Sequence, residues 1–311
     1  MITKQKFLIV IGGATAVGKS ALAIHLAQHY NTAIISADSR QIYKELTIGT
    51  AKPNETELQL VHHYFINHIS VQQHYSVSDF EGEVVQCLHQ LFLQKDVVIM
   101  VGGTGLYINA VLYGLDEIPE VNPSINSFVQ QIFDTNGIEG LQVALKDLDE
   151  TYYQNADLQN PHRLMRAIAV SMSSGKPFSS FLKHKKQARS FIPICINLVL
   201  DRGLLYEKIN HRVDIMIKNG LLNEVKNLLQ YKDTKALQTV GYQEIFDYFD
   251  GKNNLEFAID KIKQHSRNYA KRQITWFKKN VDWQDFDASV PYEIIRSYLE
   301  ERFAQTRLYS D

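Results

Sequence analysis

The stretch G-A-T-A-V-G-K-S, residues 13–20, fits the phosphate-binding pattern G-x-x-x-x-G-K-[ST]. A short apolar run, Phe7–Ile11 (FLIVI), comes just before it and is typical of a buried parallel strand. Residues 20–30 then carry apolar side chains at helical spacing. A glycine-rich turn between a strand and a helix directs backbone N–H groups and the positive end of the helix at one place. The stretch therefore predicts a site for an oligophosphate.

Two side chains of this loop have expected roles. Lys19 would bring a positive charge to the terminal phosphates, and the Ser20 hydroxyl would help to hold Mg²⁺. The pattern indicates a pyrophosphate or a triphosphate and does not specify ATP. The rest of the loop would hold the phosphates through its backbone, and it comprises Gly13, Ala14, Thr15, Ala16, Val17 and Gly18.

The composition is that of a soluble globular protein. The chain has 311 residues, of which 45% are hydrophobic and 22% are charged, enough for one large or two modest domains. Its net charge of −1 means that a nucleic-acid partner would have to meet a local basic patch. Cys87 and Cys195 lie in apolar runs without metal-ligand spacing, so we expect buried reduced thiols. We expect no signal peptide, no membrane span, a cytoplasmic location and a monomer.

The order of apolar runs predicts an α/β protein with a parallel sheet of the P-loop NTPase type, flanked by helices. Further strands are expected at residues 33–36, 96–101 and 191–200, with helical patterns between them. Between residues 115 and 190 the apolar spacing is helical throughout, and no run there is typical of a buried strand. We therefore predict a core in two parts, 1–114 and 191–311, interrupted by an all-helical insertion over 115–190.

Asp38 follows the strand expected at 33–36, and open α/β sheets bind ligands at the carboxyl ends of their strands. The alternative is that Asp38 only caps a helix. The strand at 96–101 is followed by Gly102, Gly103 and Thr104. Many ATP-using P-loop enzymes have an aspartate at such a strand end to organise Mg²⁺. Its absence here weakens an interpretation as a kinase or ATPase.

Two basic stretches could contact nucleic acid. Residues 261–279 contain seven Lys or Arg and no acid, with Tyr269, Trp276 and Phe277 between them. Cations and aromatic rings together suit unstacked RNA, although the rings could equally form the apolar stripe of a helix. The second stretch is either a phosphate contact or a solvated surface, and it contains Lys183, His184, Lys185, Lys186 and Arg189.

The chain resembles the tRNA dimethylallyltransferases, also called tRNA isopentenyltransferases, over nearly its full length. Together with the loop at 13–20, the block from Asp38 to Pro53 and the segment G-G-T-G-L-Y make this resemblance far more specific than the loop alone. The matching segments include I-S-A-D-S-R-Q-I-Y (35–43), I-G-T-A-K-P (48–53), V-G-G-T-G-L-Y-I (101–108), N-P-H-R-L-M-R-A-I (160–168), V-G-Y-Q-E (240–244) and Y-A-K-R-Q-I-T-W-F (269–277).

The resemblance implies transfer of the dimethylallyl group of dimethylallyl diphosphate to N6 of the adenine just 3′ of the anticodon in tRNA, with release of diphosphate and with Mg²⁺ as cofactor. It implies that Asp38 is the general base and orients the weakly nucleophilic amine. Lys19 would be the main cation on the diphosphate. Arg202 and Arg212 are the candidates that would close over it, although Arg212 could also be a surface arginine.

The target base cannot react inside a stacked loop, so we expect its extrusion into a channel, with the helical insertion gripping the anticodon arm. The family usually has Asp where this chain has Asn160, and relatives carry an arginine at the position of Asn126. The residues that the resemblance places on tRNA are Asp38, Ser39, Arg40, Gln41, Thr104, Asn126, Asn160, Pro161, His162, Arg163, Leu164, Lys271 and Arg272.

Three other functions compete with this interpretation. A dimethylallyltransferase acting on free adenine nucleotides has similar core motifs, but it needs neither the insertion nor the basic stretch at 261–279. A P-loop small-molecule kinase would need a carboxylate for Mg²⁺ at a strand end. A non-catalytic RNA-binding module is disfavoured because Lys19 and Asp38 are both present.

Overall fold

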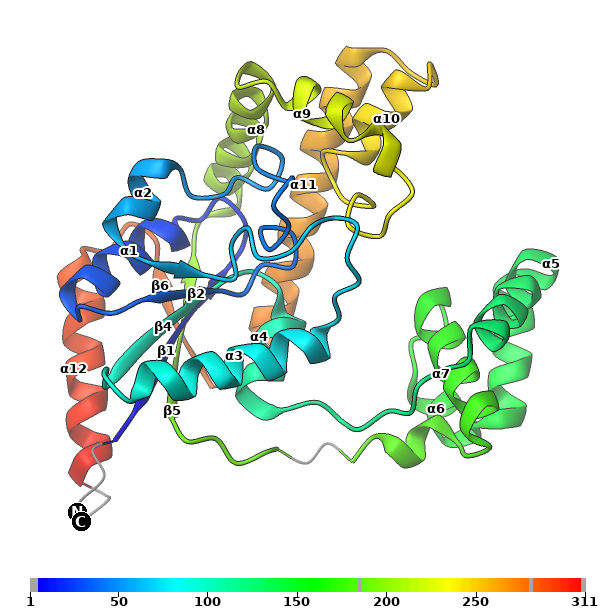
Figure 1. Ribbon diagram of the computed structural model, residues 1–311, viewed down its shortest axis with the longest axis horizontal. Helices are drawn as coiled ribbons and strands as arrows, with labels where there is room; N and C mark the ends of the chain where they lie inside the picture. The colour runs from blue at the N-terminus through cyan, green and yellow to red at the C-terminus, as the bar shows by residue number, and fades with distance from the viewer. Residues whose placement is uncertain (1–4, 184–185, 280–281, 309–311) are drawn as a thin grey trace. The chain divides into compact units, whose positions relative to one another are not determined.

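The computed structural model describes residues 5–183, 186–279 and 282–308, which form two compact units (Figure 1). Unit 1 contains the residues up to Leu112 and those from Ala188 onward, and unit 2 contains Tyr113–Gln187. The sequence placed the insertion at 115–190. His184 and Lys185 of the second basic stretch lie outside the described residues.

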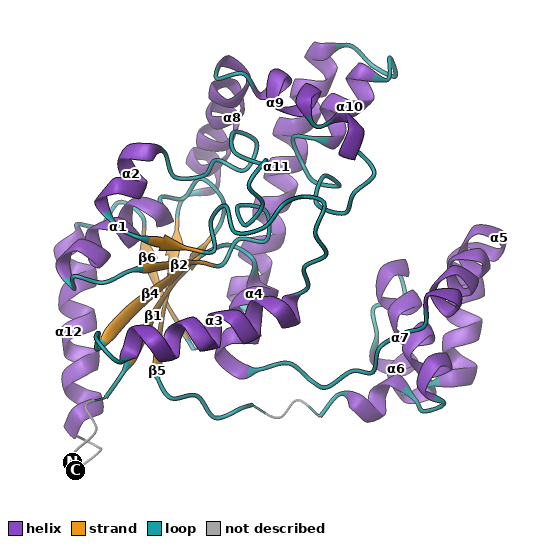
Figure 2. Ribbon diagram, in the orientation of Figure 1, coloured by secondary structure: helices purple, strands orange, loops and turns teal. Residues whose placement is uncertain are grey.

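Unit 1 is built on one six-stranded sheet in the order β3-β2-β4-β1-β5-β6, and every neighbouring pair is parallel (Figure 2). This confirms the predicted fold class. A parallel sheet brings the carboxyl ends of all its strands to one edge, where ligands bind in such folds. The strands are β1 (Phe7–Gly13), β2 (Ile34–Ser36), β3 (His63–Tyr64), β4 (Val97–Val101), β5 (Ile192–Val199) and β6 (Trp283–Asp287).

The central strand β1 is buried along its whole length, as its unbroken apolar sequence predicts. Its residue Ile9 pairs with Ile99 of β4 on one side and with Ile194 of β5 on the other. Alternate residues of β1 join a core cluster with apolar residues of α1 (Lys19–His29), α8 (Arg202–Lys218) and α12 (Tyr292–Leu308). The sheet thus fixes the loop that follows β1 at its carboxyl edge.

The remaining helices of unit 1 connect the strands or extend beyond the sheet. In Figure 1, α11 is the long orange helix, and α3 contacts β4. These helices are α2 (Glu55–Leu60), α3 (Val77–Phe92), α4 (Gly105–Tyr113, which continues into unit 2 by one residue), α9 (Leu221–Asn227), α10 (Gln243–Phe249) and α11 (Leu255–Lys278), with a short 3₁₀ turn at Leu229–Tyr231.

Unit 2 is helical, and none of its described residues lies in a strand. Its core joins apolar residues of α5, α7 and the 3₁₀ turn, including Leu145, Leu164 and Phe178. α5 is kinked at Gly137, whose backbone is non-helical with φ +63° and ψ −156°. The elements are α5 (Pro123–Leu148), α6 (Glu150–Asn155), α7 (Pro161–Ser174) and a 3₁₀ turn at Phe178–Phe181.

Two expectations about single residues need correction. Cys195 is buried and Cys87 is only partly buried, and both are free thiols. Arg189 does not belong to a solvated basic surface, because its guanidinium pairs with Glu81 at 2.6 Å and both side chains are nearly buried. Among the described residues, no helix combines the length and apolar character that a bilayer crossing requires.

Candidate active site

The loop between β1 and α1 has the backbone geometry that its sequence predicts. β1 ends at Gly13 and α1 begins at Lys19. Gly18 caps the helix with φ +111°, a left-handed conformation that glycine adopts without strain. No side chain of a described residue caps the first turn of α1. Its amides therefore point into the space beside the loop, which suits an anion.

Two cavities in unit 1 open at this edge of the sheet. The first, which we call the loop cavity, has a volume of about 300 Å³ and is lined by Gly18, Lys19 and Ser20 together with Gly102 and Gly103. The second, which we call the helix cavity, has a volume of about 390 Å³. Its apolar wall comes from α8 and α11 and comprises Ile209, Val213, Met216 and Ile262.

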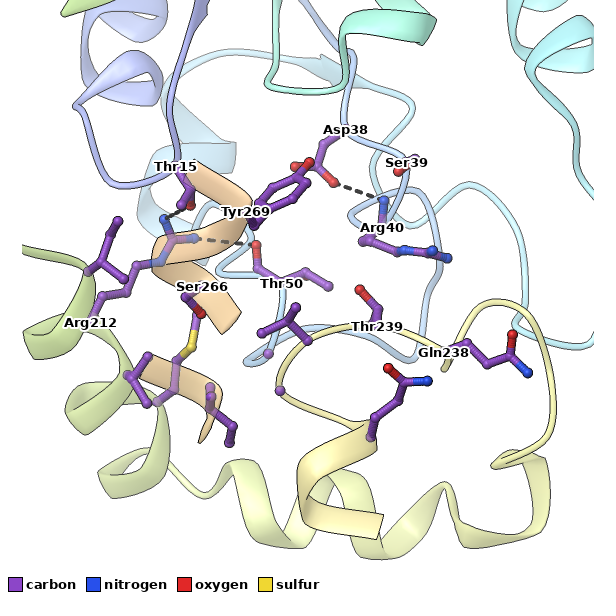
Figure 3. Close-up of a pocket in the computed structure, with 18 of the residues that line it drawn as sticks. Thr15, Asp38, Ser39, Arg40, Thr50, Arg212, Gln238, Thr239, Ser266 and Tyr269 are labelled. Carbon is purple, nitrogen blue, oxygen red and sulfur yellow. Dashed lines mark hydrogen bonds between the residues drawn. The ribbon is translucent and has the colours of Figure 1, made fainter. Parts of the chain in front are cut away.

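Four residues line both cavities and mark the place where they meet: Thr15, Asp38, Arg212 and Tyr269. Figure 3 shows them together, with the ring of Tyr269 extending from α11 toward Asp38. They come from the phosphate-binding loop, the end of β2, α8 and α11. A molecule bound in one cavity can therefore react with a molecule bound in the other only beside these side chains.

Asp38 uses only one of its carboxylate oxygens to shape the backbone. Oδ1 accepts the N–H of Arg40 at 2.8 Å and the N–H of Gln41 at 3.2 Å. Oδ2 accepts no hydrogen bond from a described residue. The capping role considered from the sequence is thus present, but it serves a turn and leaves the second oxygen for a ligand. Asp38 is therefore oriented rigidly at the boundary of the two cavities.

Lys19 lines the loop cavity and is half-buried, and its Nζ donates to the carbonyl of Ala14 at 2.7 Å. The pKa of Lys19 falls from 10.5 to about 7, because burial and the positive charge of Arg212 lower it by more than the negative charge of Asp38 raises it. An anion in this cavity would reverse the effect, because it stabilises the charged amine.

Hydrogen bonds hold the Arg212 side chain at the two cavities, whereas Arg202 lies outside both. Arg212 donates to the Thr15 hydroxyl at 3.1 Å and lies 3.5 Å from the carbonyl of Thr50 (Figure 3). The structure thus favours a site residue over a surface arginine. Arg202 is exposed, lines neither cavity and donates to the Tyr206 hydroxyl at 3.1 Å. Of the two arginines predicted to bind the diphosphate, only Arg212 lies at the cavities in this structure.

Thr104 is in neither cavity lining. Its Oγ1 accepts the N–H of Ser39 at 3.2 Å and lies 3.4 Å from the Ser39 hydroxyl. Ser39 and Arg40 line the helix cavity and Gln41 lines the loop cavity. The guanidinium of Arg40 donates to the carbonyl of Lys235 at 3.1 Å. This bond ties Arg40 to the segment just before Gln238–Gly241, which lines the helix cavity. A direct contact of Thr104 with a bound base stays a prediction.

Gln273 is a site residue that the sequence did not reveal. Its side chain is buried, accepts the N–H of Thr15 at 2.8 Å and donates to the carbonyl of Gly103 at 3.0 Å. It therefore joins the phosphate-binding loop to the glycine loop after β4. Its spacing from Tyr269, four residues along α11, places both on one face of that helix, and this spacing was the available signal.

The loop cavity has side-chain oxygens of the kind that Mg²⁺ binds, and the Ser20 hydroxyl would hold an ion that arrives with a phosphate. The Ser20 hydroxyl and the Asp38 carboxylate both line the cavity. No cluster of three or more His, Cys, Asp or Glu side chains in the described part of the chain could hold a metal alone. Mg²⁺ commonly binds through few protein ligands and completes its shell with phosphate oxygens and water.

Comparison with known proteins decides the family. Residues 41–280 match the family model described as IPP transferase. The chain belongs to this family. It is 50% identical over 300 residues to a tRNA dimethylallyltransferase of Christiangramia forsetii, covering 96% of this chain and 99% of the relative. It is 48% identical over 303 residues to a tRNA dimethylallyltransferase of Flavobacterium johnsoniae, covering 96% and 98%.

Two solved structures of IPP transferases share the fold. The tRNA isopentenylpyrophosphate transferase of Bacillus halodurans has a TM-score of 0.74 at 31% identity and covers 99% of this chain and 100% of its own. A eukaryotic dimethylallyltransferase captured acting on tRNA has a TM-score of 0.76 at 26% identity and covers 91% of this chain and 74% of its own.

The segment Asn160–Leu164 forms the N-cap and the first residues of α7 in unit 2. Asn160 caps the helix, accepting the N–H of Arg163 at 3.3 Å, a role that Asn and Asp fill equally well. His162 and Arg163 are exposed, as is Asn126 on α5. The side chain of Leu164 is fully buried in the core of unit 2, so the tRNA contact predicted for this residue would have to come from its backbone.

The basic stretch at 261–279 is largely the helix α11, and its two faces differ. Lys271 and Arg272 are exposed, and Arg272 also lines the helix cavity. Phe277 is buried, and Trp276 packs edge-on against it. These two rings therefore form the apolar stripe of the helix, the alternative left open by the sequence. Of the three rings, only Tyr269 lines the loop cavity and the helix cavity.

The lowered pKa of Lys19 predicts proton uptake when diphosphate binds. Near pH 8 the free amine is mostly neutral because its pKa is about 7, and a bound anion raises that pKa. Affinity for inorganic diphosphate should therefore fall as the pH rises above 7. Calorimetry at pH 8 in two buffers of different ionisation enthalpy should show nearly one more proton taken up by the wild type than by Lys19→Arg. Equal uptake would contradict this assignment.

Proposed function

We propose that the protein transfers the dimethylallyl group from dimethylallyl diphosphate to N6 of the adenine 3′-adjacent to the anticodon in tRNA and releases diphosphate. One observation carries the proposal: a phosphate-binding cavity and a second, partly apolar cavity meet at Asp38. A transferase needs this arrangement, because donor and acceptor must approach each other in a fixed geometry. Membership of the IPP transferase family supplies the chemical class.

The donor's diphosphate would occupy the loop cavity. The amides of α1 and the side chains of Lys19 and Arg212 would hold it, and they would stabilise the charge that grows on it as the bond between carbon and oxygen breaks. If bound, Mg²⁺ would sit at the Ser20 hydroxyl and neutralise part of the same charge. The dimethylallyl carbon would then lie at the boundary between the two cavities.

Asp38 would act on the acceptor at that boundary. The N6 amine attacks the first carbon of the dimethylallyl group, the new bond between nitrogen and carbon forms, and the electron pair of the broken bond leaves on diphosphate. The amine loses one proton, and Oδ2 of Asp38 is the carboxylate oxygen available to receive it. Held by two backbone amides through Oδ1, the carboxylate also fixes the direction of the amine.

The acceptor is proposed to be tRNA because the chain has features that a free nucleotide does not need. Unit 2 adds a separate helical body of residues 113–187 with exposed His162 and Arg163. Exposed Lys271 and Arg272 lie on the helix that carries Tyr269. We propose that unit 2 grips the anticodon arm, that the target base enters the helix cavity, and that the enzyme acts as a monomer.

Nucleoside analysis tests the proposed product. An anticodon stem-loop with adenine 3′ of the anticodon should yield N6-dimethylallyladenosine after incubation with enzyme, dimethylallyl diphosphate and Mg²⁺. A matched stem-loop with guanine at that position should yield none. Modification of the guanine variant at another adenine would contradict the proposed target.

The cations of α11 give a second test of the tRNA interface. Replacing Lys271 or Arg272 with glutamine should weaken stem-loop binding at all ionic strengths. It should also reduce the slope of log Kd against log salt by about one for each residue, because one phosphate contact is lost. Fluorescence anisotropy across a salt series measures this. Arg302→Gln, on α12 and lining neither cavity, is the control and should leave the slope unchanged. Unchanged slopes for all three variants would remove Lys271 and Arg272 from the interface.

A further inference from the structure

Glu224 of α9 binds the backbone of a distant loop through both of its carboxylate oxygens. Oε2 accepts the N–H of Thr47 at 3.1 Å and of Ile48 at 2.7 Å, and Oε1 accepts the N–H of Gly49 at 3.0 Å. Hydrogen bonds to a charged acceptor are stronger than those between neutral groups. One side chain thus fixes three successive amides of the segment 46–52, which we call the threonine loop.

Tyr242 completes this contact from the other side. Its hydroxyl donates to Oε1 of Glu224 at 2.6 Å, and its side chain is fully buried. Its ring lies against Gly49 so closely that a Cβ there would approach it to 2.5 Å. Tyr242 directly follows Gln238–Gly241, which line the helix cavity. Glu224 therefore joins two separate walls of that cavity.

The threonine loop in turn contacts two side chains of the candidate site, those of Gln41 and Arg212. The carbonyl of Thr50 accepts the side-chain amide of Gln41 at 3.1 Å and lies 3.5 Å from Nη2 of Arg212. Gly49 and Thr50 line the helix cavity, whereas Ala51 and Lys52 line the loop cavity. Displacing this loop would move both walls and remove one partner of Arg212.

We propose that Glu224, held by Tyr242, is a positioning residue that fixes the threonine loop and through it the placement of Arg212 on the donor's diphosphate. Glu224 itself lines neither cavity, so it acts only through the loop. The inference deepens the proposed function and rests on it. Its first consequence is physical and independent of turnover: the amides of residues 47–49 owe their protection from solvent exchange to this carboxylate.

The matched control is Glu45. Its carboxylate accepts the Ser70 hydroxyl at 2.6 Å and the N–H of Val71 at 3.0 Å, in the same unit, and it lines neither cavity. Glu45→Gln and Glu224→Gln make the same chemical change to a carboxylate that holds a loop. Tyr242→Phe removes a single oxygen and serves as a second, milder variant.

Three measurements on the full-length chain test the proposal. In Glu224→Gln, hydrogen exchange of the amides 47–49 should accelerate at least tenfold, and binding of inorganic diphosphate should weaken. The KM for dimethylallyl diphosphate should rise about tenfold, while the KM for the stem-loop changes less than twofold. Tyr242→Phe should show the same pattern in smaller degree. Glu45→Gln should change none of these quantities.

The outcomes distinguish failure of the positioning role of Glu224 from failure of the proposed transferase function. If exchange accelerates and diphosphate binding weakens in an enzyme that modifies no stem-loop, the positioning role stands and the proposed function fails. If transfer is normal and Glu224→Gln changes the KM for both substrates equally, or neither, Glu224 has a merely structural role. Unchanged exchange at 47–49 in both Glu224→Gln and Tyr242→Phe would overturn the proposal outright.

Discussion

Replacing Asp38 with asparagine is expected to lower kcat by about 100- to 10,000-fold, the range that a positioned general base contributes. Asparagine is suited to this test because its side-chain oxygen can still accept the N–H groups of Arg40 and Gln41, which Oδ1 of Asp38 now accepts. The turn after β2 should therefore survive. The variant loses the negative oxygen at the boundary of the two cavities, which is the feature assigned to the reaction.

Single-turnover transfer to a stem-loop measures this effect without interference from product release. The KM for dimethylallyl diphosphate should change little, because Asp38 is assigned to the amine. Asp201 provides a matched control. It also follows a strand, its Oδ1 caps α8 by accepting the N–H of Gly203 at 2.8 Å and of Leu204 at 3.1 Å, and it lines neither cavity. Asp201→Asn should keep wild-type turnover. Turnover in Asp38→Asn equal to that of the control would disprove the general-base role.

Replacing Lys19 with methionine should reduce kcat/KM by about 100- to 1,000-fold, because it removes a cation of the loop cavity that is assigned to the diphosphate. Binding of inorganic diphosphate should weaken in parallel. Methionine has a similar length and suits an enclosed position, so the loop should keep its backbone conformation. Calorimetry with diphosphate and steady-state kinetics measure the two effects.

Lys19→Met should also have a larger free energy of unfolding than the wild type. The Lys19 amine has a pKa of about 7 in the folded protein and about 10.5 in the unfolded chain, so below pH 10.5 its protonation favours the unfolded state. Between pH 7 and 10.5 the unfolded state binds more protons, so wild-type stability rises with pH and the advantage of Lys19→Met shrinks. Thermal unfolding across this range tests the sign. Lys6→Met, which removes an amine paired with Asp96 at 3.0 Å, should keep diphosphate binding. Full diphosphate binding by Lys19→Met would exclude Lys19 from the phosphate site.

Local sequence patterns predicted the sheet and the phosphate-binding loop because both depend on residues close together in the chain. The strands β1, β2, β4 and β5 are predominantly apolar runs, as burial on both faces requires, with Ser36 and Asn197 as buried polar exceptions. The edge strands β3 and β6 were missed. β3 pairs through only two residues, and β6 has only two apolar residues, Trp283 and Phe286, among three polar ones, since an edge strand needs little apolar surface.

The site residues that belong to a sequence motif were predicted. The site residues that depend on contacts between distant segments of the chain were missed. Lys19, Asp38 and Arg212 converge as expected, and Gly13–Ser20 forms the loop. The contacts of Gln273 with Thr15 and of Glu224 with Gly49 join residues 258 and 175 positions apart, which no local pattern reveals. Leu164 was assigned to tRNA from a motif, although its apolar spacing with Ala167 and Ile168 already indicated the core face of α7.

The most direct measurement is prenyl transfer from radiolabelled dimethylallyl diphosphate, offered an anticodon stem-loop and AMP in parallel with Mg²⁺. The proposed function predicts label on the stem-loop and none on AMP, with the label lost in Asp38→Asn. Label on AMP alone would contradict the tRNA assignment and favour an enzyme acting on free nucleotides. Label on neither acceptor from a folded enzyme that binds diphosphate would contradict the transferase itself.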